Sequence, residues 1–413
     1  MPRRILIVGG VNIPEILEAV ERCECRAVVL AMPSPAGGRP PAAAIDEVER
    51  MDFRDQAGLV RKILQLHERW RFSGILAVVD FVMVPVAVAA ARLRLPGCSL
   101  RTVRDTVEKF RMRHALERAG LGQVRHALCR SRQEAEAFFA EAGGPIIGKP
   151  AMGTGSEGVS RVDRAGELAP AVALAAAALG NGTVLCEEFL DGPEVSLEAC
   201  TVDGRFIPIA LTDKHTNERF LEIGHDQPSC HPGPVRRAVE ELAERTLAAL
   251  GVEHGVTHSE FKLTGRGPVL VETHTRKGGG SIHLLTRITT GVDLSELTVR
   301  AALGESPDVR PLATGESAVV RFLVGPPGRI AAIGMPLAER GDGIAGAGLW
   351  VKPGDEVLPR SSSNDRLGYV VASGPSPEIA RRRAEGFLAR VRVEYESVPE
   401  PFTEEEIPCR AAS

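Results

Sequence analysis

Short apolar runs alternate with amphipathic stretches along the first part of the chain. Runs with the length and composition of buried strands fall at residues 5–8, 27–31 and 74–79, and stretches with helical spacing fall at 14–22, 56–71 and 84–94. Strands that alternate with helices in this way predict a parallel, Rossmann-like α/β sheet. The Gly9-Gly10 turn after the first run lacks the G-x-G-x-x-G pattern, so dinucleotide binding is not predicted here.

The pattern changes after residue 100, where strand-like runs are joined by turns as well as by helices. The strongly basic stretch 102–119 has the spacing of one continuous helix. A strand at 206–212 is followed by a polar stretch up to Pro228 that we expect to be a loop. Residues 305–318 have the composition of a linker. We therefore predict three domains, at 1–100, 101–305 and 306–413, the last of them α+β.

Residues 258–281 contain two strand-like runs on either side of a glycine-containing turn. A hairpin symmetric about Arg266 places Glu260 opposite Glu272 and His258 opposite His274. Like charges directly opposite on paired strands repel each other, so we expect a cation between the two carboxylates. Carboxylate oxygens are ligands that Mg²⁺ prefers. Taken alone, the pattern fits two solvated surface glutamates equally well.

A glycine-rich loop follows the predicted strand that ends at Lys149. Its glycines Gly153, Gly155 and Gly158 match G-x-G-x-x-G, but a strand-like run comes next, where a Rossmann fingerprint requires a helix. Neither a Walker A lysine nor the kinase catalytic motifs follow. A glycine loop between two strands is typical of a hairpin whose amides close over phosphates. The alternative is an ordinary turn.

Composition narrows the function classes. With 54 acidic and 50 basic side chains in 413 residues, the chain has no excess of positive charge for nucleic acid. Its eight cysteines are scattered, which fits a reducing environment better than a disulfide framework. No apolar run reaches the roughly 18 residues of a transmembrane helix, and the first apolar run is too short for a signal peptide. We expect a cytoplasmic protein that binds neither nucleic acid nor membrane.

Taken in order, these motifs resemble those of the ATP-grasp superfamily. They are Lys109 with Arg113 on the basic stretch, Lys149, the glycine loop, the segment 187–194, and Glu260 with Glu272, which stands four residues before Arg276. With Asp-Arg-Leu-Gly-Tyr at 365–369, the likeness covers essentially the whole chain. Within this superfamily, the sequence is most similar to carboxylate–amine ligases of the L-amino acid ligase (bacilysin-synthetase) type. The resemblance implies an ATP-grasp fold with an N-terminal Rossmann-like (pre-ATP-grasp) domain and a C-terminal α+β segment.

The resemblance also implies a reaction and its site. ATP would phosphorylate a carboxylate, such as that of an amino acid, to an acyl phosphate, and an amine would displace phosphate to form an amide. The partners are then ATP, a small carboxylic acid and an amine, with a homodimer as one assembly to consider. Mg²⁺, or Mn²⁺ in its place, would bind Glu260 and Glu272, while Arg276, Lys214 and His225 would act on the reacting groups. The ATP-binding residues would be Lys109, Lys149, Gly153, Thr154, Gly155, Ser156, Gly158, Glu187, Glu188, Phe189, Leu190 and Glu194.

His274 departs from the family pattern. Many ATP-grasp enzymes carry Glu-x-Asn at the second metal site, and imidazole is a softer ligand than Mg²⁺ normally selects. Three other functions stay open: a carboxylating or nucleotide-biosynthetic ATP-grasp enzyme, a ligase that loads a carrier protein, and an ATP-binding module without turnover. A zinc hydrolase built from the histidines lacks His-Glu-x-x-His and leaves the glycine loop unexplained.

Overall fold

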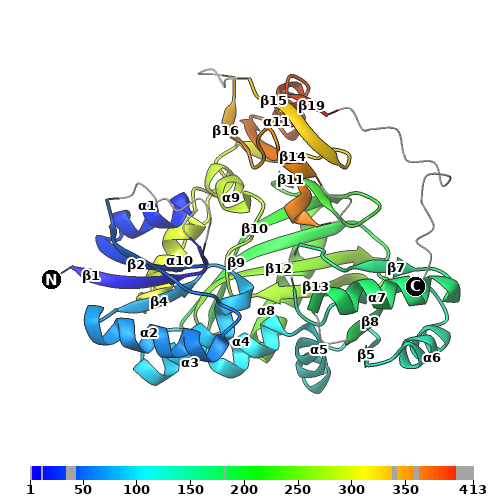
Figure 1. Ribbon diagram of the computed structural model, residues 1–413, viewed down its shortest axis with the longest axis horizontal. Coiled ribbons are helices and arrows are strands. Elements are labelled where there is room, and N and C mark those ends of the chain that lie inside the picture. The colour runs from blue at the N-terminus through cyan, green and yellow to red at the C-terminus, as the bar shows by residue number, and fades with distance from the viewer. Residues whose placement is uncertain are drawn as a thin grey trace, which may run out of the picture.

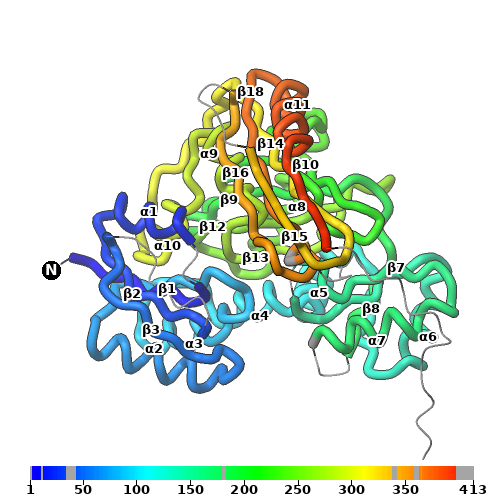
Figure 2. The backbone as a smooth tube through the Cα atoms, turned by 45° about the horizontal axis from the view of Figure 1, so that its top comes forward, coloured from blue at the N-terminus to red at the C-terminus, as the bar shows by residue number. Residues whose placement is uncertain are grey.

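The structure, a computed structural model, describes residues 2–10, 13–33, 43–153, 155–179, 183–336, 342–357 and 362–396. Within these ranges the strands form four sheets. Figures 1 and 2 show the N-terminal sheet and a smaller sheet, formed by strands between residues 126 and 188, on opposite sides of a long central sheet, with the C-terminal elements at the far end of that central sheet. The predicted ATP-grasp type of α/β architecture is therefore built from separate layers around one large sheet.

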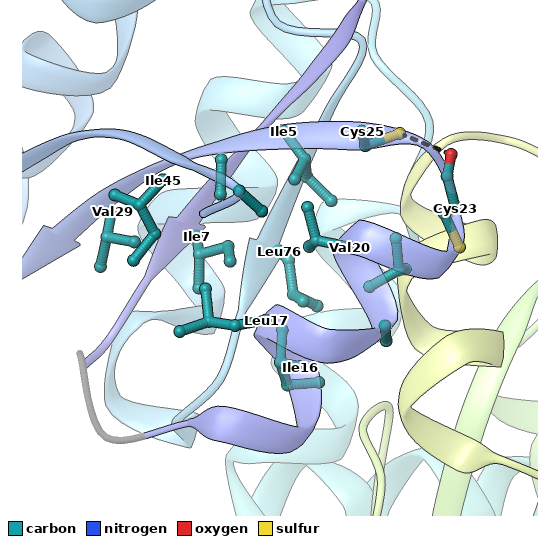
Figure 3. Close-up of a cluster of buried hydrophobic side chains, with 14 of the residues drawn as sticks. Ile5, Ile7, Ile16, Leu17, Val20, Cys23, Cys25, Val29, Ile45 and Leu76 are labelled. Atoms are coloured by element: carbon teal, nitrogen blue, oxygen red, sulfur yellow. Dashed lines mark hydrogen bonds between the residues drawn. The ribbon is translucent and has the colours of Figure 1, made fainter. Parts of the chain in front are cut away.

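The N-terminal sheet is parallel, with strand order β3-β2-β1-β4. Its elements are β1 (Arg3–Val8), α1 (Pro14–Arg22), β2 (Cys25–Ala31), β3 (Ile45–Arg50), α2 (Gln56–Trp70), β4 (Gly74–Ala77), the 3₁₀ turn η1 (Asp80–Val82) and α3 (Met83–Leu93). Helix α1 covers one face together with the later helix α10 (Leu294–Ala302), and α2 and α3 cover the other. Figure 3 shows Ile5 and Ile7 of β1 packed toward Ile16, Leu17 and Val20 of α1.

This sheet confirms the predicted Rossmann-like layer. Strands β1 and β2 are buried on both faces, as parallel strands between two helical layers must be, and they read as continuous apolar runs. Strand β3 was not predicted, because its sequence Ile-Asp-Glu-Val-Glu-Arg is mostly charged. It lies at the sheet edge, where one row of side chains reaches solvent and charge is tolerated.

A smaller antiparallel sheet has the order β5-β8-β6-β7. Two helices pack with it around one apolar cluster. Its elements are β5 (His126–Cys129), α6 (Arg132–Ala142), β6 (Ile146–Lys149), β7 (Ser160–Val162), η2 (Ala165–Glu167), α7 (Leu168–Leu179) and β8 (Val184–Glu188). The glycine loop joins β6 to β7 across an antiparallel pair, which confirms the predicted hairpin.

The central sheet has eight strands in the order β13-β12-β9-β10-β11-β14-β18-β16. Its elements and covering helices are β9 (Glu194–Val202), β10 (Arg205–Thr216), β11 (Glu222–Gln227), α8 (Gly233–Leu250), β12 (Gly255–Thr264), β13 (Gly267–His274), α9 (Ile282–Thr290), β14 (Ser317–Leu323), β16 (Ile344–Leu349), β18 (Gly368–Gly374) and α11 (Pro377–Leu388). A third small sheet contains β15 (Gly328–Gly334), β17 (Glu356–Val357) and β19 (Arg392–Tyr395), and η3 (Ser363–Asp365) precedes β18. Strands after residue 305 thus continue the sheet that begins before it, and the predicted boundaries at 100 and 305 remain predictions.

The basic stretch 102–119 does not form the single helix that its spacing predicts. It is split into α4 (Leu100–Val107) and α5 (Lys109–Arg118) by Glu108, whose backbone is extended (φ −92°, ψ 99°). The Lys109 amide leaves the helical ladder and donates to Ala151 O in the glycine loop at 3.0 Å. A tertiary contact therefore overrides the helical pattern and fixes the direction of Lys109.

The polar stretch after residue 212 is also not a loop. Strand β10 runs to Thr216 and turns back as β11, with Lys214 opposite His225. The sequence predicted a loop because polar side chains usually face solvent. Here they form ion pairs within the sheet, and Asp213, Lys214, His225 and Asp226 are all buried.

Candidate active site

A cleft of about 150 Å³ lies between the β5–β8 sheet and the central sheet. Most of the predicted site residues meet here: Lys109, Lys149, Gly153, Gly155, Ser156, Glu187, Glu188, Phe189, Leu190, Glu194, Lys214, Glu260 and Glu272. Gly158, His225 and Arg276 do not line the cleft itself, and Thr154 lies outside the described residues.

Lys109 enters the cleft from the first residue of α5. Its Nζ donates to Gly153 O at 2.7 Å and lies 2.7 Å from Glu272 Oε2. Burial lowers the pKa of Lys109, but Glu272, Asp80 and Glu260 together outweigh burial, and the net shift is upward. The ammonium group is therefore held charged between the glycine loop and the predicted metal site.

Lys149, at the end of β6, belongs to a buried ion triad. Glu187 accepts from Lys149 Nζ at 2.6 Å and from Arg113 Nε and Nη2 at 2.7 and 3.0 Å. Burial raises the pKa of Glu187, but the charges of Arg113 and Lys149 outweigh it and lower the pKa to about 2. Arg113 also donates to Leu270 O and Val271 O at 2.8 Å each. The Glu187 side chain thus fixes Lys149 and, through Arg113, the strand that carries Glu272.

The segment after Glu187 lines the same end of the cleft. The amides of Glu188 and Phe189 donate to Arg125 O and Pro145 O at 3.0 and 2.9 Å. These two N–H groups are therefore occupied within the protein. A flat ring bound here would have to use other main-chain groups or side chains of this segment, which narrows the predicted backbone contact.

The glycine loop bridges several parts of the molecule. Gly153, Gly155 and Gly158 have φ of +131°, +69° and +74°, which side chains rarely adopt. Ser156 Oγ donates to Phe220 O at 2.9 Å, and the Ser363 amide donates to Gly155 O at 3.0 Å. Gly158 has a packing role instead, because a Cβ there would lie 2.9 Å from Pro150 Cγ. The loop is held at the edge of the cleft by the β10–β11 turn and the C-terminal segment.

Glu260 and Glu272 are direct partners across β12 and β13, and so are His258 and His274, as predicted. The premise of a regular turn was wrong, however. Near the turn the register is shifted by one, pairing Phe261 with Leu270, and a bulge between Glu260 and Phe261 restores the predicted pairing. Bulges are common beside active sites, where they redirect side chains. Here the bulge brings both carboxylates to the same level of the cleft.

Lys214 neutralises part of this acidic cluster. Its Nζ lies 2.9, 2.8 and 2.6 Å from carboxylate oxygens of Glu194, Glu222 and Glu260. Burial lowers the pKa of Lys214, but the three glutamates raise it well above its usual value. Burial raises the pKa of Glu260, but Lys214 and His258 together outweigh burial and lower the pKa to about 2. Four glutamates, including Glu272, thus line one end of the cleft.

The two paired histidines each connect a predicted metal-binding carboxylate to a second carboxylate. His258 contacts Glu198 through Nδ1 and Glu260 through Nε2, the latter at 3.0 Å. His274 lies 3.4 Å from Asp80 through Nδ1 and 3.1 Å from Glu272 through Nε2. The rings stack with centroids 6.3 Å apart.

These contacts explain the unusual His274. Burial lowers the pKa of both imidazoles, but neighbouring carboxylates outweigh it, raising the pKa of His258 to about 10 and that of His274 above its usual value. His274 contacts Asp80 through Nδ1 and Glu272 through Nε2, and so orients the Glu272 carboxylate in this structure.

Arg276 lies just beyond β13 and is held by the N-terminal sheet. Its Nε and Nη2 donate to Asp80 Oδ1 and Oδ2 at 2.7 and 2.5 Å, and Lys277 beside it contacts Glu15 at 2.9 Å. The Gly278 amide donates to Glu198 Oε2 at 3.0 Å, so a buried carboxylate already uses this N–H group.

His225 lies behind the cleft. It is almost fully buried, packs edge-on against Phe322 at 5.6 Å, and its Nε2 is 3.8 Å from Glu222. Burial is the main reason that its pKa falls to about 3, so it is neutral at pH 7. A Cβ on Gly280 would lie 2.8 Å from His225 Nε2, which places the imidazole under the turn that leads into α9.

Three residues that contribute to the site were not predicted from the sequence. Asp80 follows β4 directly, and an acidic residue at the carboxyl end of a parallel strand is a signal that could have identified it. Glu222 was hidden in the stretch taken for a loop. Arg366, quoted only as part of a motif, is buried and contacts Glu222 at 2.6 Å, with its guanidinium 3.8 Å from the Phe322 ring centroid.

Comparison with known proteins agrees with this geometry. Residues 26–97 match the model of the ATP-grasp N-terminal domain, residues 142–284 that of the ATP-grasp domain, and residues 321–396 that of the L-amino acid ligase C-terminal domain 2. In the described ranges, no helix is both long enough and apolar enough to span a bilayer.

Two individual proteins show similarity to this chain in sequence. An uncharacterized protein of Sinorhizobium fredii is 28% identical over 374 residues, covering 88% of this chain and 77% of that protein. Alanine–anticapsin ligase of Bacillus subtilis is 26% identical over 262 residues, which is 58% of this chain but only 56% of the ligase.

A solved L-amino acid ligase from Bacillus licheniformis superposes with a TM-score of 0.82 at 21% identity, covering 96% of this chain and all of that one, and so shares the fold. The matched domains, their order and the cleft between them agree with the sequence motifs. The chain belongs to the ATP-grasp superfamily and is similar to its L-amino acid ligases.

Proposed function

We propose that this protein is an ATP-dependent, ADP-forming carboxylate–amine ligase that acts on small acids such as amino acids. The observation that carries the proposal is the alignment of Glu260 and Glu272 on paired strands, with Lys109 and Lys214 on either side. Phosphoryl transfer depends mainly on positioning and charge neutralisation, and this arrangement provides both.

The cleft offers one end to a nucleotide base and the other to phosphates. Phe189 and Leu190 give apolar surface at one end, and Lys109 and Lys149 give fixed positive charge beside the glycine loop. We assign the two lysines to the phosphates and Glu194 to the ribose hydroxyls. Glu194 has one oxygen on Lys214 and the other 3.1 Å from Lys262, so its carboxylate is fixed in direction.

The chemistry of Glu260 and Glu272 fits a hard divalent cation such as Mg²⁺, because both offer ionised oxygens in a water-poor site. When bound, such an ion would neutralise charge that develops on the transferred phosphoryl group. The protein's own part is to hold the two carboxylates ionised and oriented. Lys214 and His258 do this for Glu260, and Lys109 and His274 do it for Glu272.

Arg276 would stabilise the negative charge of the reacting acid. In the proposed reaction a carboxylate oxygen attacks the γ-phosphorus of ATP and ADP leaves. The amine nitrogen then attacks the acyl phosphate carbon, phosphate leaves, and the amine loses a proton. Arg276 keeps unpaired N–H directions beyond those given to Asp80 and Lys277 O, so it can contact an anion while Asp80 holds its orientation.

A screen of acid–amine pairs with Mg·ATP tests the proposal. We expect phosphate and ADP to appear together with an amide, in equal amounts, and only when both an acid and an amine are present. Formation of AMP and pyrophosphate would point to adenylation and overturn the proposal. A protein with Glu272→Gln serves as the negative control, because it removes one carboxylate charge from the site while keeping its size.

A further inference from the structure

A second cavity has Arg276 among its lining residues, and we name it the apolar pocket. It measures about 110 Å³ and lies between the N-terminal sheet and the central sheet, with walls from β4, α3, α10 and the start of β12. Asp80 pairs with Arg276 and lies 3.4 Å from His274 Nδ1, and His274 Nε2 lies 3.1 Å from Glu272. A short chain of contacts therefore connects the arginine of this pocket to the predicted phosphoryl-transfer site.

The pocket is open because its walls are built from small side chains. Alanines project from three elements: Ala77 from β4, Ala87 and Ala90 from α3, and Ala301 and Ala302 from α10. Larger apolar residues, such as Met83 and Val86, complete the wall. An apolar cavity between two layers loses packing contacts and is costly to keep empty, so small residues here suit a ligand better than they suit stability.

The polar groups of the pocket are few. Among the described residues that line it, Arg276 is the one side chain with a permanent charge. Thr275 Oγ1 and His254 Nε2 also belong to lining residues, and both atoms are buried without a hydrogen-bond partner within the described ranges. The rest of the lining is mostly apolar, so the pocket suits a ligand group that is mostly hydrocarbon.

We propose that the apolar pocket receives the hydrocarbon part of the carboxylate substrate, with the carboxylate end held at Arg276. This proposal rests on the proposed ligase function and specifies its acid: a small acid with an apolar chain or side chain, and not a polar or acidic one. Charge complementarity places the carboxylate at Arg276, and the absence of other permanent charge among the described lining residues excludes a second ionised group from the pocket.

The volume sets the size of the group. An apolar cavity of about 150 Å³ can hold benzene, so 110 Å³ suits an aliphatic group of about three to five carbons, such as the side chain of valine or leucine. Each buried methylene should raise kcat/KM about fourfold until the pocket is full. We therefore expect activity to rise from glycine to leucine, or from acetate to hexanoate, and to fall beyond that length.

Filling the pocket tests the assignment. In Ala90→Leu the new side chain occupies the cavity, whereas Ala91→Leu makes the same change at the next, exposed position of α3. With the acid series, an amine and Mg·ATP, we expect Ala90→Leu to lower kcat/KM at least tenfold for the longest good acid and less than twofold for the shortest. Ala91→Leu should match the parent protein at every length.

Met83→Ala enlarges the pocket and guards against a filled variant that fails to fold. It should move the best acid to a longer chain, which a purely structural role of Met83 would not do. Equal losses at all chain lengths in Ala90→Leu, together with an unchanged optimum in Met83→Ala, would overturn the proposal.

Calorimetric binding of the same acids separates this proposal from the ligase function. Longer acids that bind the parent and Ala91→Leu, but not Ala90→Leu, support the pocket even if no amine supports turnover. If phosphate is released with an amide but neither turnover nor binding depends on chain length in any variant, the pocket assignment fails and the ligase assignment stands. If acids bind in the pocket but no pair releases phosphate, the ligase assignment fails instead.

Discussion

Replacing Glu187 with glutamine should remove the ion pair that holds Lys149, the lysine assigned to the phosphates, in position. In the folded protein Glu187 is the shared partner of Lys149 and Arg113, and the side chains of all three are less than a tenth exposed. Glutamine has nearly the same shape, so the change removes charge and leaves little cavity. Two buried cations then lose the carboxylate that neutralises them.

The structure sets the size of the effect. Removing one partner of a buried, hydrogen-bonded ion pair costs about 3–5 kcal/mol, because the remaining charge stays desolvated. The neighbouring Glu188 provides a matched control. Its ion-pair partners, Arg125 and Arg266, are more than half exposed, and such pairs contribute about 0–1 kcal/mol. Glu188→Gln on the same strand should therefore change stability little.

Hydrogen exchange of peptides from β6 and β8 measures the difference locally. In Glu187→Gln, amides that exchange by opening of this sheet should exchange about 10²- to 10⁴-fold faster, and in Glu188→Gln less than about tenfold faster. Mg·ATP affinity should fall more in Glu187→Gln than in Glu188→Gln, because Lys149 loses its fixed position only in Glu187→Gln. Equal exchange rates in the two variants would refute the view that Glu187 supports the site.

The same carboxylate predicts a pH dependence. Its folded-state pKa of about 2 is below the ordinary value of about 4.3, so its contribution to stability is complete above about pH 4.5. That contribution is lost as the pH falls from about 4.5 toward 2. The protection of amides in the β5–β8 sheet, relative to unstructured peptides at the same pH, should fall across this window in the parent and less so in Glu187→Gln. A parallel response in both proteins would contradict the assignment.

Three further changes probe other parts of the site. Asp80→Asn removes the charge that orients Arg276 and should lower kcat about 10²-fold while the Kd for Mg·ATP stays within twofold; a change in Kd alone would show that Asp80 acts on nucleotide binding. Glu272→Gln should raise the Mg²⁺ concentration needed for half-maximal nucleotide binding at least tenfold, and an unchanged titration would contradict its role as a ligand. Arg366→Met removes the buried cation beside Glu222, so the C-terminal segment that contacts the glycine loop loses an ion pair. Nucleotide dissociation in stopped-flow measurements should therefore become faster. An unchanged rate would show that this segment does not hold the glycine loop in place.

The parts of the molecule with local signals could be predicted from the sequence. Parallel strands buried on both faces read as apolar runs, and the glycine loop was identified by the strand that follows it. The pairing of Glu260 with Glu272 was also predicted, although a bulge near the turn compensates for a register that the symmetric turn did not foresee. These features depend on residues close together in the chain.

What depended on distant contacts could not be predicted. The helix break before Lys109 has no proline or glycine to announce it and results from a hydrogen bond to Ala151 O. The hairpin that carries Lys214 looked like a loop, because its charged side chains are buried in ion pairs with β9 and β12. The role of Asp80 could not be predicted because it depends on a contact with Arg276, which is distant in the sequence. Ion pairs between distant segments produce no periodic pattern of hydrophobic and polar residues, so the sequence pattern cannot predict them.

The most direct test of the central claim follows oxygen from the acid to the phosphate. The protein is incubated with Mg·ATP, an amine and an acid whose carboxylate carries ¹⁸O, and the phosphate released is analysed by mass spectrometry. An acyl phosphate must transfer one carboxylate oxygen to phosphate when the amine displaces it, so we predict one ¹⁸O atom per phosphate, with ADP and amide in equal amounts. Label in AMP, or phosphate free of ¹⁸O beside a formed amide, would contradict the account.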